Sequence, residues 1–133
     1  MIKGGCLCDA VRFTVVGEFD PVSICHCKMC RQWHGAPGPY ANARWDDLRF
    51  DEQDALQWYQ SSSFARRGFC SECGSSLFWQ QISAPVVSVV VGAIDDPTGL
   101  RAQKHIFVAH KGDWYEIVDG LPRFPDDSPS AGG

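Results

Sequence analysis

The sequence predicts a mainly β fold, made of small and irregular antiparallel sheets. Segments rich in Val, Ile, Phe and Tyr are short and recur along most of the 133 residues, as strands do. Gly, Pro, Asp and Ser stand between these segments, where turns are needed. Apolar residues at helical spacing are almost absent. A chain of this length buries about two-thirds of its unfolded surface, so it can form a hydrophobic core.

In the first half of the chain, residues 10–16 are rich in β-forming side chains and predict a strand, which Gly17 ends. Residues 28–33 predict one short helical turn, ended by Gly35 and Pro37. The remaining strands and apolar segments of this half are expected at residues 21–25, 40–44, 48–50, 56–59 and 64–69.

In the second half, residues 85–94 predict the clearest buried strand, because valine dominates them. We expect residues 1–124 to form a single domain. Pro, Ser, Gly and Asp in residues 125–133 predict a flexible C-terminal tail. The other elements expected in this half are an apolar segment at 77–81, a turn at 95–99 and a strand at 105–110.

Charge and hydropathy argue against two classes of partner. Twelve Lys and Arg residues face 16 Asp and Glu residues, for a net charge of −4, whereas nucleic-acid binding draws on clustered basic side chains. The longest strongly apolar run, residues 85–94, is far shorter than the ~20 residues that cross a membrane. The first residues contain no apolar stretch of signal-peptide length. We therefore expect a cytoplasmic protein without nucleic-acid or membrane partners.

The seven cysteines carry the strongest functional signal. None stands alone, and an odd number in a chain without an export signal indicates metal binding rather than disulfides. They fall into three tight groups, which are Cys6-x-Cys8, Cys25-x-Cys27-x-x-Cys30 and Cys70-x-x-Cys73.

The first and last groups together supply four thiolates, which is a standard ligand set for structural, tetrahedral zinc. This site would join Cys6 and Cys8 to Cys70 and Cys73, far along the chain. Gly74 suits the turn after the last pair, because glycine adopts positive φ without strain. Asp9 follows the first pair, and Asp is enriched at such left-handed positions.

The middle group supplies three thiolates, and no fourth protein ligand is obvious. Zinc with three protein ligands and an open position is typical of a catalytic site. Alternatively, His34 could complete the site and make it structural. His26 lies between two of the cysteines, so we expect its side chain to point away and to form hydrogen bonds instead.

Other residues have simpler interpretations. His105 and His110 lie in an apolar segment and are expected to be core or edge histidines. The five tryptophans are expected in the core or in pocket walls. Arg66 and Arg67 form a partly solvated strand face, from which one guanidinium could reach an anionic ligand.

These motifs resemble those of the glutathione-dependent formaldehyde-activating enzyme family. The resemblance runs from about residue 3 to residue 124, and Asp9 departs from it, since the family usually has glycine after the first pair. The segments that carry it are GGCLC at 4–8, CHCKMCR at 25–31, RGFCSECGSSLF at 67–78, HIF at 105–107 and GLPRF at 120–124.

The resemblance implies an Mss4-like, β-tent type of fold with two zinc sites. It implies a structural zinc on Cys6, Cys8, Cys70 and Cys73. The zinc associated with catalysis is implied on Cys25, Cys27 and Cys30. The implied activity is that of a carbon–sulfur lyase, which reversibly joins glutathione and formaldehyde to give S-hydroxymethylglutathione.

This chemistry assigns further candidate roles. Arg31, Arg66 and Arg67 are candidates to bind the carboxylates of glutathione as a co-substrate. His26 or His34 is expected to carry the proton between sulfur and oxygen, since both lie near the three-cysteine group in sequence. Two other classes of function stay open: a non-catalytic, zinc-stapled binding module and a thiol redox or zinc sensor.

Overall fold

A computed structural model describes residues 1–128. Within this range, β1 (Ile2–Gly5), β2 (Arg12–Val15) and β5 (Leu48–Glu52) form a sheet in the order β1-β2-β5. A seven-stranded sheet has the order β10-β3-β4-β9-β8-β7-β6. Its strands are β3 (Val22–Cys25), β4 (Gly38–Arg44), β6 (Leu56–Gln60), β7 (Ala65–Cys70), β8 (Ser76–Gln81), β9 (Val86–Val90) and β10 (Ala102–Ile106).

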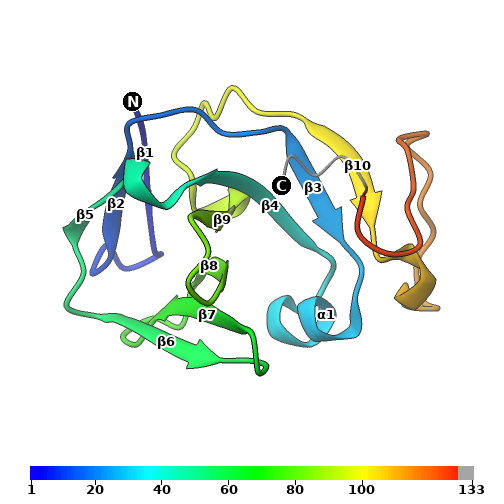
Figure 1. Cartoon of the computed structure of the whole chain (residues 1–133), viewed down its shortest axis with the longest axis horizontal. Coiled ribbons are helices and arrows are strands. Elements are labelled where there is room, and N and C mark those ends of the chain that lie inside the picture. The colour runs from blue at the N-terminus through cyan, green and yellow to red at the C-terminus, as the bar shows by residue number, and fades with distance from the viewer. Residues whose placement is uncertain (129–133) are drawn as a thin grey trace.

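Short helices lie between these strands or, in one case, after the last of them. The α-helix α1 (Lys28–His34) lies between β3 and β4 in the chain, and the 3-10 helices are η1 (Trp45–Asp47), η2 (Val91–Ala93) and η3 (Val108–His110). Figure 1 shows β1, β2 and β5 at one end of the molecule and β3 and β10 toward the other. None of the helices in the described part of the chain is long and apolar enough to cross a bilayer.

The predicted mainly β class is confirmed, and its strand pairs are antiparallel with one difference. β10 pairs in parallel with β3, in a register that sets His105 beside Ile24. The chain reaches this edge only after the long connection that follows β9, so the pairing joins segments far apart in sequence. It places residues 102–106 next to the strand that ends at Cys25.

The structure also changes three expected boundaries. The strand expected at 10–16 is shorter, since the chain turns around Asp9 (φ 66°) before β2 begins. The strand expected at 85–94 ends at Val90, where η2 follows. The strand expected at 105–110 is wrong in its second half, because Phe107 adopts a left-handed conformation (φ 56°) and η3 follows.

The glycine-rich start of the chain forms β1, which lies tightly against its neighbours. A Cβ atom on Gly4 would lie 2.4 Å from the carbonyl oxygen of Ala93 and 2.5 Å from Cζ of Phe13. Gly4 also forms an isolated antiparallel bridge with Ile94. Glycine therefore allows the three-stranded sheet to approach the end of η2 closely.

The hydrophobic core lies between the two sheets and is rich in aromatic rings. Phe78 on β8 is fully buried. Its ring centroid lies 5.2 Å from that of Phe13, 5.8 Å from that of Phe50 and 5.9 Å from that of Trp58. The first two of these pairs meet edge to face, a favourable arrangement for aromatic side chains.

The expected C-terminal tail is held at its beginning. The amide of Phe107 donates to the carbonyl of Asp126, and the amide of Ala109 donates to that of Pro125. Ser128 is buried. Residues 129–133, the rest of that tail, lie outside the described residues.

Replacing Phe78 with alanine should lower the free energy of unfolding by about 3–5 kcal/mol, because the cavity would remove contacts with three aromatic rings. Urea unfolding of the protein, followed by tryptophan fluorescence, measures this change. Phe64→Ala is the control, since Phe64 is 57% exposed and should cost far less. Equal losses in the two variants would contradict the assigned core.

Candidate functional site

The four cysteines of the first and last groups meet in space. Cys6 and Cys8 follow β1, Cys70 ends β7 and Cys73 lies in the turn before β8. Their sulfur atoms all lie within 4.8 Å of one another. The Sγ atoms of Cys6 and Cys8 are 3.7 Å apart, and those of Cys8 and Cys70 are 3.8 Å apart. Tetrahedral zinc with bonds of about 2.3 Å requires a sulfur spacing of about 3.8 Å, so these thiols fit the metal.

Backbone geometry supports this four-cysteine group. The amide of Val11 donates to Cys6 Sγ at 3.2 Å, and that of Cys73 donates to Cys70 Sγ at 3.5 Å. Ser75 Oγ lies 3.1 Å from Cys73 Sγ and lowers the pKa of that thiol to about 5. Asp9 and Gly74 have the positive φ expected after each pair, 66° and 80°. Such donors favour thiolates, the form that binds zinc.

The three cysteines of the middle group also meet, with their sulfur atoms within 4.8 Å of one another. Cys25 ends β3, Cys27 caps the N-terminus of α1 and Cys30 lies in the first turn. The amide of Cys30 donates to Cys27 Sγ at 3.3 Å. Hydrogen bonds from the thiols of Cys25 and Cys30 lower the pKa of Cys27 to about 2. Cys27 is therefore the thiol of this group that ionises first, whereas hydrogen bonds to Cys27 and Cys30 raise the pKa of Cys25.

The position of α1 depends on Trp33, which anchors the helix on the seven-stranded sheet. Its Nε1 donates to Ser76 Oγ at 2.7 Å. Its ring stacks on Tyr59 with centroids 6.0 Å apart and meets Phe69 edge to face at 5.8 Å. These contacts hold the helix that carries Cys30 against strands β6, β7 and β8.

No fourth ligand joins the three-cysteine group within residues 1–128. His34, the alternative fourth ligand, instead has its Nε2 atom 2.5 Å from the hydroxyl of Tyr40. Burial, and then the charge of Arg67, lower the pKa of His34 to about 4, so its imidazole is neutral. The arrangement therefore resembles an open three-ligand site rather than a closed structural one.

All three thiols line a cavity of about 740 Å³, large enough for a small organic substrate. Its other walls combine polar and apolar side chains. Among them are Tyr40, Arg67 and Lys104, and the larger side chains of Phe64, Trp79 and Phe107.

The neighbouring arginines Arg66 and Arg67 point to opposite faces of β7, as successive strand residues do. Arg67 is 2% exposed and lies in the cavity, with Nη2 3.8 Å from Cys30 Sγ. Burial would lower its pKa, but the nearby Tyr40 and Cys30 raise it overall.

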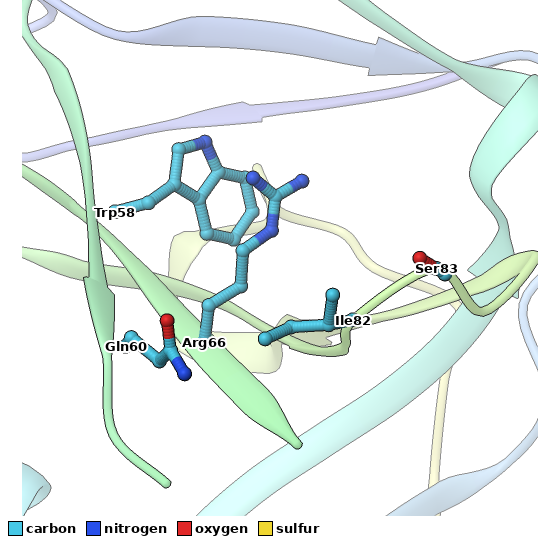
Figure 2. Close-up of a pocket in the computed structure, with 5 residues that line it drawn as sticks. All are labelled: Trp58, Gln60, Arg66, Ile82 and Ser83. Carbon is cyan, nitrogen blue, oxygen red and sulfur yellow. The ribbon is translucent and has the colours of Figure 1, made fainter. Parts of the chain in front are cut away.

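Arg66 lies on the other face, away from the three-cysteine group. Figure 2 shows its guanidinium over Trp58, in a shallow cavity of about 470 Å³ beside Gln60, Ile82 and Ser83. Its Cζ atom is 3.8 Å from the centroid of that indole, and its Nε and Nη2 donate to Gln80 Oε1.

Arg31 does not line the three-cysteine cavity either. Its Nε donates to the carbonyl of His26 at 3.2 Å and its Nη2 to that of His110 at 2.9 Å. The side chain thus ties the loop that carries Cys25 and Cys27 to η3. It acts here as a structural link between two segments.

His26 is buried and forms hydrogen bonds away from the thiols, as the sequence predicts. Its Nδ1 lies 2.7 Å from the Tyr115 hydroxyl and its Nε2 lies 2.8 Å from His105 Nδ1. His105 is also buried, and its Nε2 lies 2.9 Å from Asp119 Oδ2. Burial, followed by repulsion from His105, lowers the pKa of His26 to about 4.

Several residues of this region escape prediction from sequence. Tyr40 is expected only as part of a strand, and Lys104 and Phe107 carry no motif of chemical meaning. They enter the cavity because β4 and β10 both pair with β3. The partial signal was the resemblance over HIF at 105–107, which marks the segment but not its role.

Comparison with known proteins supports the same family. Residues 1–110 match the family described as glutathione-dependent formaldehyde-activating enzyme. A Halomonas elongata protein named "Putative glutathione-dependent formaldehyde-activating enzyme" is 30% identical over an alignment of 146 residues. The alignment covers 96% of this chain and 91% of that protein.

Two further relatives match in part. A Schizosaccharomyces pombe protein named as an uncharacterized lyase is 36% identical over 77 residues, spanning 58% of this chain and 56% of that protein. The crystal structure of a Rhodobacter sphaeroides protein is similar with a TM-score of 0.60 and 31% identity, over 75% of this chain and 97% of that one. The chain therefore belongs to the glutathione-dependent formaldehyde-activating enzyme family.

Proposed function

We propose that the protein is a zinc-dependent carbon–sulfur lyase that acts on an adduct of a thiol and an aldehyde. The first adduct to test is S-hydroxymethylglutathione. The observation that carries the proposal is the group of three thiols, without a fourth protein ligand in the described chain, on the wall of a 740 Å³ cavity. Membership of the family supports a lyase reaction that involves glutathione.

Cys25, Cys27 and Cys30 would hold the zinc of this site, and the four-cysteine group would hold a structural one. Zinc at the three-cysteine group supplies Lewis-acid chemistry and favours the ionised form of a substrate thiol. A reducing compartment such as the cytoplasm would keep the seven cysteines available as ligands.

Arg67 is the best-placed partner for a carboxylate of the substrate. It is the only one of Arg31, Arg66 and Arg67 that lines the cavity. Its Nε atom and Ser61 Oγ are the buried side-chain atoms that lack a hydrogen-bond partner among the described residues, and both residues line this cavity. Unpaired buried polar atoms in a cavity wall favour a ligand that brings acceptor atoms.

His34 is a better candidate than His26 for proton transfer. His34 reaches the cavity through Tyr40, which lines it. Both ring nitrogens of His26 bond to residues that do not line the cavity, Tyr115 and His105. We therefore expect His26 to hold in place the loop that carries Cys25 and Cys27.

Native mass spectrometry should find two zinc ions per chain, and the protein should take up glutathione at the second. Cys30→Ser should keep one zinc and the folded state, whereas Cys70→Ser should lose the structural zinc and stability, because its site joins β1 to β7. One zinc per wild-type chain without glutathione uptake would contradict the proposal and favour a binding module. Zinc loss from the three-cysteine group first, at low peroxide, would favour a redox sensor.

Arg67→Ala should weaken the apparent affinity for glutathione about 10- to 100-fold, the loss expected for one hydrogen bond to a charged group. The measurement is the rate of glutathione–formaldehyde exchange by NMR as glutathione concentration varies. Arg66→Ala is the matched control, because it removes the same side chain from the other face of β7. An equal loss in both variants would argue against Arg67 as the carboxylate partner.

His34→Ala should lower turnover about 100-fold or more, as expected when a positioned proton-transfer group is removed. Zinc content should stay at the wild-type value. His26→Ala should lower turnover as well, through displacement of the cysteine loop and with a change in the visible spectrum of the cobalt-substituted protein. Wild-type turnover in His34→Ala would exclude this role.

A further inference from the structure

A chain of polar contacts leads from the three-cysteine group into the protein. Arg67 Nη2 lies 3.8 Å from Cys30 Sγ, and Arg67 Nη1 donates to the Tyr40 hydroxyl at 3.1 Å. That hydroxyl lies 2.5 Å from His34 Nε2. Every member is buried or half-buried, and Tyr40 and Arg67 line the cavity.

The chemistry of these groups determines which of them donates. Arginine can only donate, so the Tyr40 oxygen accepts the bond from Arg67. The single hydroxyl proton of Tyr40 is then free to point at His34 Nε2. Nε2 accepts it, which places the proton of the neutral imidazole on Nδ1.

Tyr40 is buried beside the three-cysteine group, and its hydroxyl has two polar partners. Only 9% of the residue is exposed, and it packs with Cys25 and Cys30 and lines the cavity together with Arg67, which donates to its hydroxyl. A tyrosine buried only for packing needs one hydrogen-bond partner, whereas this hydroxyl has a fixed donor on one side and an acceptor on the other. The oxygen is thus arranged to pass a proton between the cavity and His34.

We propose that Tyr40 is the proton-transfer residue of this site and that His34 stores the proton behind it. This inference rests on the proposed lyase function and specifies how protons move in it. No motif in the sequence links Tyr40 with His34.

The step balances without an outside reagent. In the direction of adduct formation, the proton of the substrate thiol passes to the Tyr40 oxygen, as the hydroxyl proton of Tyr40 passes to His34 Nε2. The thiolate sulfur then bonds to the aldehyde carbon, and the carbon–oxygen π pair moves to the oxygen. Tyr40 gives its proton to that oxygen and regains one from His34. Cleavage of the adduct runs through the same transfers in reverse.

Tyr40→Phe tests the proposal, because it keeps the ring and removes the hydroxyl. The protein is used in its zinc-loaded form, and glutathione–formaldehyde exchange is followed by NMR in H₂O and D₂O. We expect kcat to fall about 100-fold, KM to change less than about threefold and zinc content to stay constant. The solvent isotope effect on kcat should differ from that of the wild type.

Tyr59→Phe is the matched control and should leave turnover unchanged. Tyr59 lies on β6, is 55% exposed and does not line the cavity. His34→Gln is the second variant, because an amide oxygen can accept the bond from Tyr40 but cannot store a proton. His34→Gln should lose turnover as Tyr40→Phe does. If Tyr40→Phe does not bind zinc, the turnover of His34→Gln tests the proposal in its place.

The outcomes separate this inference from the proposed function. Wild-type turnover in His34→Gln or Tyr40→Phe, or a rise in KM alone, would overturn the proton-transfer role and leave the lyase function standing. A zinc-loaded wild type that exchanges neither glutathione nor another thiol with formaldehyde would overturn both.

Discussion

Crowded cysteine sulfur atoms are the constraint on which the rest of this structure depends. Four of them lie within 4.8 Å of one another where the beginning of the chain meets the turn after β7, and three more do so at the end of β3. Thiolates at this spacing repel one another unless a cation lies among them, and zinc matches both their chemistry and their separation. The two groups have different consequences. The first joins the two sheets at one end, and the second places reactive groups on a cavity wall.

The seven-stranded sheet divides the molecule into two environments through the alternation of its side chains. On one face, Phe78 packs with Phe13 from the three-stranded sheet, and Arg66 covers Trp58 beside them. On the other face, Arg67 reaches Cys30, and α1 rests on the sheet through Trp33. An aromatic core on one side therefore supports a cavity of mixed polar and apolar lining on the other. Such support is what a reacting site needs, since small displacements of its groups cost much of the rate.

The C-terminal segments complete the site beside β3. β10 lies beside the strand that ends in Cys25, and Phe107 then turns with positive φ at the cavity wall. His105, whose other ring nitrogen bonds to Asp119, bonds to His26, and Arg31 donates to the carbonyls of residues 26 and 110. Hydrogen bonds to residue 26 thus hold the loop that carries Cys25 and Cys27, while these cysteines line the cavity. Histidines near one another in sequence, at 26 and 34, therefore have different surroundings: His26 bonds to Tyr115 and His105, and His34 bonds to Tyr40.

The sequence by itself determined the mainly β class, the three cysteine groups and the family, because each depends on short-range spacing or composition. It also determined the left-handed turns at Asp9 and Gly74, since residue type limits φ locally. Only the tertiary structure decided that Arg67 and not Arg66 enters the cavity, that His34 bonds Tyr40, and that β10 lies parallel to β3. These relations depend on strand order and register between segments far apart in the chain. Pairing of that kind is set by packing of the whole core, which no local pattern encodes.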